Sequence, residues 1–165
     1  MIERFHATVD LTPLKKHVEA ISRGSSTPIQ RCHRRWGKRY EAFIRRDFTR
    51  QSSGGGRWPA LDPATVARRR KEGVGAKILR DTGTLLAALT IGAPGNVFKL
   101  EKDGCLFGFG GPARHPGGKA RIADIARFHD SGAGTLPQRQ IIVPPDAATI
   151  AGMESDVKWA IDQLK

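Results

Sequence analysis

The stretch that decides the fold runs from residue 28 to residue 50 and reads PIQRCHRRWGKRYEAFIRRDFTR. Its apolar side chains recur mostly every three or four residues, which is the spacing of one face of an α-helix. Ser25, Ser26 and Thr27 come before Pro28 and mark where this pattern begins. We therefore predict one long helix over 28–50, with these candidate buried positions: Ile29, Trp36, Tyr40, Phe43, Ile44 and Phe48.

The rest of this helix is strongly basic. Only Glu41 and Asp47 interrupt its positive charges, so the charge is not neutralised within the helix. Two interpretations stay open: a solvated face that happens to be rich in arginine, or a face that meets phosphate or an acidic protein subunit. The basic positions are Arg31, Arg34, Arg35, Lys38, Arg39, Arg45, Arg46 and Arg50.

Two shorter elements are expected before the long helix. Residues 2–9 alternate apolar and polar side chains well enough to predict a short strand. Thr12 followed by Pro13 is typical of a helix start, because a hydroxyl residue caps the first turn and proline fits the first helical position. An apolar stripe at helical spacing follows and ends at Gly24; it consists of Leu14, Val18 and Ile21.

After the long helix, residues 51–57 (QSSGGGR) have the composition of a flexible linker. Asp62 and Pro63 then supply the N-cap and the first turn of a short helix over 63–72. A further helix begins near Thr82. The short helix carries a second basic cluster, formed by Arg68, Arg69, Arg70 and Lys71.

The clearest hairpin lies over residues 96–110, where strands over 97–102 and 105–110 flank an Asp-Gly dipeptide at 103–104 that suits a type I′ turn. A helix over 120–129 and a strand over 140–143 come next. The final helix opens at Asp146, and its apolar positions are Ile150, Met153, Val157, Ile161 and Leu164.

These elements predict an α+β fold: a small antiparallel sheet with a long N-terminal helix, short central helices and a C-terminal helix. A length of 165 residues with 39% hydrophobic content fits one domain over 1–165 with a modest core. Within it we distinguish a basic helical part (1–50), the linker (51–57) and the remainder (58–165).

The formal net charge is +12 at neutral pH. Such a charge indicates a polyanionic partner, an acidic protein surface, a position close to DNA, or simply a well-solvated basic surface. Cys32 and Cys105 do not make a disulfide framework, so a reduced cytosolic setting is the default. No apolar run approaches the roughly 18 residues that a membrane span needs, and we expect no membrane partner.

Nothing in the sequence demands catalysis. His129 and Asp130 are a tempting pair, but adjacent residues at a helix end do not face each other. The cysteines and histidines lack the paired spacing of zinc sites, and the glycine-rich runs lack the pattern of a phosphate-binding loop. The acids are scattered rather than clustered as a nuclease would need. We therefore expect a protein that is not an enzyme and uses no cofactor and no metal.

Two stretches resemble the motifs of one known family. In the first stretch, Trp-x-x-Leu is followed by a threonine and basic tract and by Ile-Leu-x-x-Thr-Gly-x-Leu; its marker residues are Trp58, Leu61, Thr82, Gly83 and Leu85. In the second stretch, Ala-x-x-His-x-x-Gly is followed by Pro-x-Arg; its marker residues are His129, Gly132, Pro137 and Arg139. The ordered combination resembles the phage virion-morphogenesis proteins, the tail-completion proteins of Mu-like and P2-like phages.

The resemblance implies a structural virion component at the head–tail junction, as a neck, tail-completion or tail-terminator protein. It implies a ring, six-fold by preference, around the channel through which DNA passes. The expected partners are other copies of the chain, the portal, connector and tail-tube proteins, and DNA in the channel. The expected location is the virion, after assembly in the host cytoplasm. A non-sequence-specific nucleic-acid-binding protein outside virions is the alternative that the charge supports.

The marker residues have expected structural roles under this resemblance. The tryptophan and leucine of the first stretch should anchor the short helix in the core, Asp81 or Thr82 should cap the next helix, and Gly83 should permit a close approach. His129 and Gly132 should shape a turn. Pro137 and Arg139 should launch the strand, with Arg139 paired to an acid or a neighbouring subunit. The candidates for contact with DNA or acidic subunits are Arg31, Arg34, Arg35, Lys38, Arg39, Arg45, Arg46, Arg68, Arg69, Arg70, Lys71 and Arg139.

Overall fold

A computed structural model describes residues 27–54, 56–73 and 75–164. The strand expected over 2–9 and the helix expected from Pro13 to Gly24 lie outside the described residues. The described part is α+β, as expected. Its elements are α2 (Pro28–Arg50), β1 (Ser52–Ser53), β2 (Gly56–Arg57), α3 (Pro63–Lys71), α4 (Thr84–Ala87), β3 (Asn96–Leu100), β4 (Cys105–Phe109), α5 (Ile122–Ser131) and α6 (Ala147–Asp162).

Helix α2 confirms the predicted long helix. The Thr27 hydroxyl accepts a hydrogen bond from the Gln30 N–H at 3.2 Å, and Pro28 lies in the first turn. The helix ends at Gln51, whose left-handed conformation (φ 54°) turns its N–H back to the last helical carbonyls. Among the predicted core positions, Phe43, Ile44 and Phe48 are buried, whereas Ile29, Trp36 and Tyr40 are half-buried.

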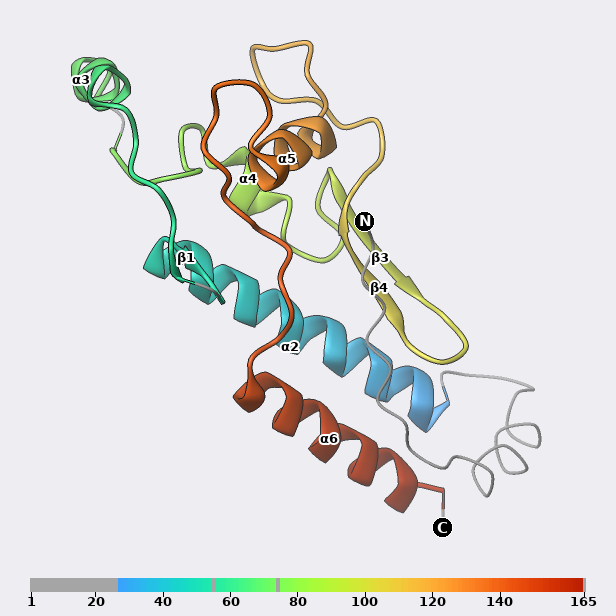
Figure 1. The fold of residues 1–165 in the computed structure, drawn as a ribbon. Coiled ribbons are helices and arrows are strands. Elements are labelled where there is room, and N and C mark those ends of the chain that lie inside the picture. Colours follow the sequence, from blue (N-terminus) through green and yellow to red (C-terminus); the bar gives the residue numbers. More distant parts are fainter. Residues whose placement is uncertain (1–26, 55, 74, 165) are drawn as a thin grey trace.

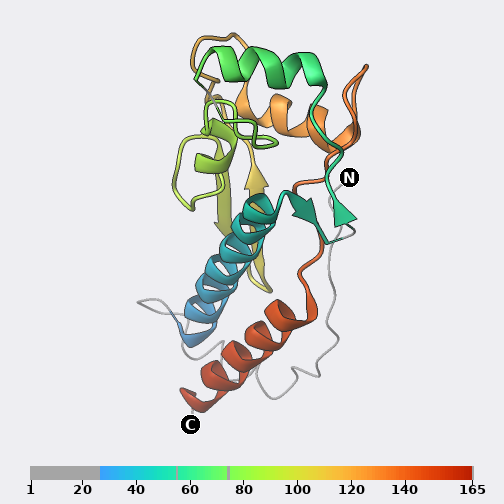
Figure 2. The ribbon, with the colours of Figure 1, turned by 90° about the vertical axis from the view of Figure 1, so that its left-hand side faces the viewer.

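Helices α2 and α6 lie side by side in Figures 1 and 2. Asp146 caps α6 by accepting a hydrogen bond from the Thr149 N–H at 2.9 Å. At this end Arg46 pairs with Asp146 at 2.6 Å, while near the start of α2 the Arg35 guanidinium lies 3.7 Å from the ring centroid of Trp159. The two helices are therefore antiparallel.

The face of α6 that packs on α2 is not the face that the apolar spacing predicts. The buried residues of α6 are Asp156 and Ala160. Directed polar bonds orient the helix, because Arg39 donates to the Asp156 carboxylate and the Trp36 indole donates to the Met153 carbonyl at 3.0 Å. The predicted apolar positions are exposed or half-buried instead: Ile150, Met153, Val157, Ile161 and Leu164.

The predicted hairpin is present, with β3 and β4 paired antiparallel so that Phe98 lies opposite Phe107. Its turn differs from the prediction. A type I′ turn needs positive φ at both central residues, and neither Asp103 nor Gly104 has one. Four residues, 101–104, connect the strands instead. The hairpin lies close to α2, because the ring of Phe98 occupies the space that a side chain at Gly37 would need.

Residues 51–57, expected to be a flexible linker, contain the short antiparallel pair β1 and β2. Gln51 holds this pair in place with two different groups. Its carbonyl accepts a hydrogen bond from the Trp58 N–H at 3.0 Å, and its side-chain oxygen accepts one from the Ile78 N–H at 2.9 Å. Composition alone did not indicate these contacts, because they depend on the left-handed end of α2.

The strand predicted over 140–143 is wrong, because these residues are not assigned to a strand and none of the described strands pairs with them. The alternation is nevertheless real: Ile141 and Val143 are buried and Ile142 is exposed. Side chains of Trp58, Asp130 and Tyr40 form hydrogen bonds with the backbone of this segment, where a neighbouring strand would otherwise do so. Trp58 Nε1 donates to the Gln140 carbonyl (3.0 Å), the Ile141 N–H donates to Asp130 Oδ1 (3.0 Å), and the Tyr40 hydroxyl donates to the Val143 carbonyl (2.6 Å).

Helix α4 also begins differently from the expectation. Its N-cap is Gly83, with φ 75°, rather than Asp81 or Thr82. A side chain at Gly83 would meet nothing within 4 Å, so the position requires a left-handed backbone and not a close approach. The Thr82 hydroxyl still accepts a long hydrogen bond from the Thr84 N–H, at 3.4 Å, and lies 2.8 Å from the Thr84 hydroxyl.

The core lies where α2, the β3–β4 hairpin, α4, α5 and the extended segment over 140–143 meet (Figure 1). Leu85, a marker residue, is buried here, and Leu61 is partly buried against the cluster. The cluster consists of Phe43, Ile44, Phe48, Trp58, Ile78, Leu79, Leu85, Ala88, Leu89, Ile122, Ala126, Ile141 and Val143.

Candidate functional site: the basic surface of α2

The eight cations of α2 fall into two groups. Four form ion pairs with carboxylates: Lys38 with Glu41, Arg46 with Asp146, and both Arg35 and Arg39 with Asp156. The other four form no ion pair within 4.0 Å among the described residues; they are Arg31, Arg34, Arg45 and Arg50. A large part of the positive charge therefore remains uncompensated on one helix.

Asp156 organises the part of this surface that adjoins α6. The residue is only 3% exposed, and its carboxylate receives two bonds from Arg39, at 2.6 Å from Nε and 3.2 Å from Nη2. Arg35 Nη1 lies 3.6 Å from the same carboxylate. The hydrogen bond to Asp156 raises the pKa of Arg39 above its ordinary value. Asp156 thus fixes two guanidinium groups that remain partly open to solvent.

A shallow, open depression with a volume of about 400 Å³ lies at this place, lined by Arg34, Arg35, Lys38, Arg39 and Asp156. Four cations against one carboxylate leave it with a formal charge of +3. Arginine donates in a planar fork that matches phosphate and carboxylate groups, so the depression can bind an anion. Contacts of this kind position a polyanion without reading a base sequence.

The second basic tract, on α3, is separate from this surface. Helix α3 lies beyond the C-terminal end of α2, far from the half that carries Arg34 (Figure 1). Arg68 pairs with Glu72 at 2.8 Å, whereas Arg70 and Lys71 form no ion pair with a described residue. The two tracts do not form one continuous patch.

Two of the predicted contact residues are buried. Arg69 donates from Nη1 to the Lys77 carbonyl at 2.9 Å, and its Nε lies 3.2 Å from Asp81 Oδ1. Arg139 is 4% exposed. It donates to the backbone carbonyls of Pro59 and Ala60 at 3.0 and 2.9 Å, rather than to an acid as expected. Both arginines therefore hold the fold together and are not on an accessible surface.

His129 lies near these two arginines and is half-buried. Burial, followed by the charges of Arg139 and Arg69, lowers the pKa of His129 below its ordinary value. Its Nδ1 is buried and has no hydrogen-bond partner in the described part of the chain, and its carbonyl accepts the Arg139 N–H at 2.7 Å. Gly132 ends α5 in the left-handed conformation (φ 68°), which fits the turn that was expected there.

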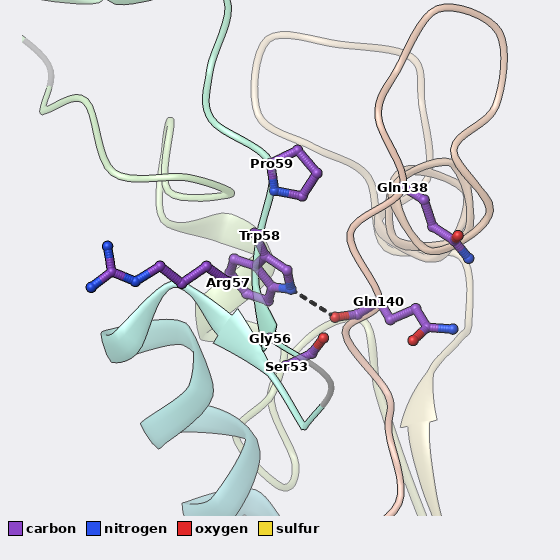
Figure 3. A pocket seen from close by; sticks show the side chains of 7 residues that line it. All are labelled: Ser53, Gly56, Arg57, Trp58, Pro59, Gln138 and Gln140. Atoms are coloured by element: carbon purple, nitrogen blue, oxygen red, sulfur yellow. Dashed lines mark hydrogen bonds between the residues drawn. The ribbon is translucent and has the colours of Figure 1, made fainter.

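The residues of the two family-like stretches meet around Trp58. The Trp58 ring lies edge-on to that of Phe48, with centroids 5.1 Å apart, and its Nε1 reaches the Gln140 carbonyl. A polar cavity of about 200 Å³ lies between Trp58 and the segment that carries Gln138 and Gln140 (Figure 3). Figure 3 shows the Arg57 guanidinium pointing away from these two amides. Pro137 begins the extended segment that follows α5.

Asp156 is a functional residue that the sequence analysis does not identify, because it is a lone acid within an apolar helix pattern. A usable signal was present: Gly152, Asp156 and Ala160 recur every four residues and so share one face. The small residues leave room for long partners. A side chain at Gly152 would lie 2.6 Å from an Arg39 guanidinium nitrogen.

Searches of protein-family models, curated proteins and solved structures find no match to this chain. Among residues 27–54, 56–73 and 75–164, no three histidine, cysteine or acidic side chains are grouped as a metal site would need. Within the same ranges, no helix has both the length and the apolar character to cross a membrane.

Proposed function

We propose that this chain is a structural component of a tailed phage's head–tail junction. In this role it is not an enzyme. It acts as a neck, tail-completion or tail-terminator subunit that forms a ring, six-fold by preference, around the DNA channel. Its partners in this proposal are further copies of itself and the portal, connector and tail-tube proteins.

One observation carries the proposal: two family-like stretches occur in the family's order, and their residues contact each other in the fold. Trp58 of the first stretch bonds to Gln140, directly after the second stretch. Arg139 of the second bonds to the carbonyls of Pro59 and Ala60 in the first. The two stretches are far apart in sequence but together form one structural unit, which is what the proposal requires of a motif divided along the chain.

The basic surface of α2 is consistent with the same role. If Arg31, Arg34 and Lys38 face the lumen of a ring, they contact DNA phosphates without sequence preference. If they face outward, they meet acidic neighbouring subunits and speed association. Arg35, stacked on Trp159 and held by Asp156, keeps its orientation in either case.

Electron microscopy of intact particles tests the proposal. We expect density for this subunit as a ring between portal and tail, and the number of copies in the ring gives its symmetry. Purified particles that lack the chain, by both density and mass spectrometry, would contradict it.

The alternative is a non-sequence-specific nucleic-acid-binding protein outside virions, which the uncompensated cations of α2 favour. It requires the isolated monomer to bind random duplex DNA with an affinity that falls steeply with salt concentration. Strong binding by the monomer, together with absence from particles, would replace the head–tail proposal with this one.

A further inference from the structure

The N-terminal half of α2 presents several cations on one face, which lies beside α6 (Figure 2). The cations are three, four and seven residues from the first of them, a spacing that places side chains on the same side of a helix. All are exposed; they are Arg31, Arg34, Arg35 and Lys38. Helix α6 holds Arg35 at this face, because the guanidinium lies 3.7 Å from the Trp159 ring centroid and 3.6 Å from the Asp156 carboxylate.

We propose that this face binds the phosphate backbone of a nucleic acid and that Asp156 is its positioning residue, which holds Arg35 and Arg39 ready to donate to phosphate. The inference deepens the proposed function, on whose contact between α2 and DNA it rests. Arg31 and Lys38 are about 10 Å apart along the helix axis. One DNA strand advances about 3.4 Å per nucleotide, so the face spans about three successive phosphates.

A nucleic acid fits this face better than an acidic protein subunit. Protein interfaces have an apolar centre. The large apolar side chains that are exposed in the described part of the chain lie elsewhere, and none of them is on α2. Arginine predominates among the cations of the face, and its planar fork matches the oxygens of a phosphate group.

Asp156 lies behind the guanidinium groups that it holds. Its side chain is only 4% exposed, whereas those of Arg35 and Arg39 are 47% and 44% exposed. Arg39 donates to both oxygens of the carboxylate, from Nε and from Nη2. An anion therefore reaches the two arginines from the solvent side while Asp156 fixes them from the protein side.

Asp156 has two opposing effects on the binding of an anion. An arginine that is already held in place loses little side-chain freedom on binding, which changes the affinity by a factor of about 2–12 for each side chain. The negative charge of Asp156 repels the anion, but a unit charge about 8 Å away in salt solution changes the affinity by about twofold or less. For Arg35 and Arg39 together, orientation therefore outweighs repulsion.

This balance predicts that removing a negative charge weakens the binding of a polyanion. Asp156→Asn keeps the size of the side chain but replaces one acceptor oxygen with a donor, so Arg39 can no longer make both bonds. We expect the full chain to bind a labelled duplex of random sequence about 3–10 times more weakly, as measured by fluorescence anisotropy at low salt.

The matched control is Glu154→Gln, which removes an equal charge from an exposed position on the opposite side of α6. It should bind the duplex as tightly as the unmodified chain, or up to about twofold more tightly. If folded Asp156→Asn binds as tightly as Glu154→Gln, net charge alone governs the binding and Asp156 is not a positioning residue.

A second pair of variants keeps every charge and changes only exposed residues, so it tests the face even where Asp156→Asn does not fold. Arg35→Lys loses the planar fork and the stacking on Trp159, and we expect binding about fivefold weaker. Arg57→Lys makes the same change at an exposed position on β2 and should leave binding within about twofold. Equal affinities for the two variants would overturn the assignment of this face.

Competition distinguishes the two kinds of polyanion. Inorganic polyphosphate should displace the duplex at a lower concentration of negative charge than polyglutamate does, because the face is built for phosphate. Stronger competition by polyglutamate would assign the face to an acidic protein subunit instead. If the unmodified chain binds neither duplex nor polyphosphate at low salt, the site does not exist. The place of the chain in virions would still stand or fall separately, by microscopy of particles.

Discussion

Helices α2 and α3 are both rich in arginine, yet they attach to the protein in opposite ways. Helix α2 buries Phe43, Ile44 and Phe48 in the core and presents its cations to solvent. The single residue that α3 buries is itself an arginine, Arg69, held by a carbonyl and a carboxylate. Positive charge in a sequence therefore does not distinguish a binding surface from a structural anchor. The burial and the acceptors of each guanidinium make that distinction.

The largest effect should follow from removing the apolar anchor of α2. Phe48→Ala deletes a buried ring that packs edge-on against Trp58, and we expect the free energy of unfolding to fall by about 3–5 kcal/mol. Urea denaturation measures it. The matched control is Phe128→Ala, the same change at a 40% exposed position, which should cost less than about 1 kcal/mol.

The second largest effect on stability should follow from replacing Arg69, the one buried residue of α3. Arg69→Ala leaves the Lys77 carbonyl without its donor and removes one of the two arginines that pair with Asp81, and we expect a loss of about 1–3 kcal/mol in unfolding free energy. Arg70→Ala, an exposed neighbour, should stay within about 0.5 kcal/mol. Arg69→Lys should not restore stability fully, because lysine lacks the planar fork. Equal effects for the two alanine variants would remove the distinction between anchor and surface.

Acidification should weaken the packing around His129 on α5, which lies near Arg69 and Arg139. The pKa of His129 is lowered in the folded protein by burial, Arg139 and Arg69, so the unfolded chain binds a proton more readily. The stability that neutral His129 contributes is therefore constant above about pH 6.5, the ordinary pKa of histidine, and decreases as the pH falls below it. Thermal melts from pH 7 to pH 5 measure this slope.

His129→Gln should reduce the slope, because the side chain no longer titrates. Some slope should remain from His33, whose pKa is also lowered by burial. A His129→Gln variant with an unchanged slope would assign the whole effect to other groups.

The smallest effect on stability, and the clearest effect on binding, should come from the open cations of α2. Arg34→Glu should change the unfolding free energy by less than about 0.5 kcal/mol. It should weaken binding to duplex DNA. The slope of the logarithm of the binding constant against the logarithm of the salt concentration should become shallower by about one. Arg70→Glu on α3 is the matched change on the other tract. If Arg70→Glu weakens binding more than Arg34→Glu, the surface lies on α3 and not on α2.

Elements with local signals were predictable from the sequence. The apolar spacing and the Thr27-Pro28 start give α2 its bounds, and Asp62 caps α3 as expected, accepting from the Ala64 N–H at 2.8 Å. The β3–β4 hairpin also follows from its own residues. Each of these elements is determined by residues that lie close together in the sequence, within about one or two helical turns, and sequence patterns are informative over such distances.

Features that depend on distant partners were not predictable. The orientation of α6 follows from Arg39 and Asp156, which are 117 residues apart, and not from its own apolar spacing. The burial of Arg69 and Arg139 likewise depends on carbonyl groups that only the fold brings near. On the candidate surface, the identity of the cations was predictable, but the division between paired and unpaired cations was not.

The extended segment over 140–143 has a consequence for the order of folding. Its attachments span long stretches of sequence: Trp58 and Gln140 are 82 residues apart, and Tyr40 and Val143 are 103 apart. Contacts across such distances form late, because the loop-closure entropy must be overcome before any bond compensates for it. Helix α2 and the hairpin need no such closure. We therefore expect segment 140–143 to dock after α2 is in place, so that Ile141→Val mainly accelerates unfolding and leaves the folding rate nearly unchanged.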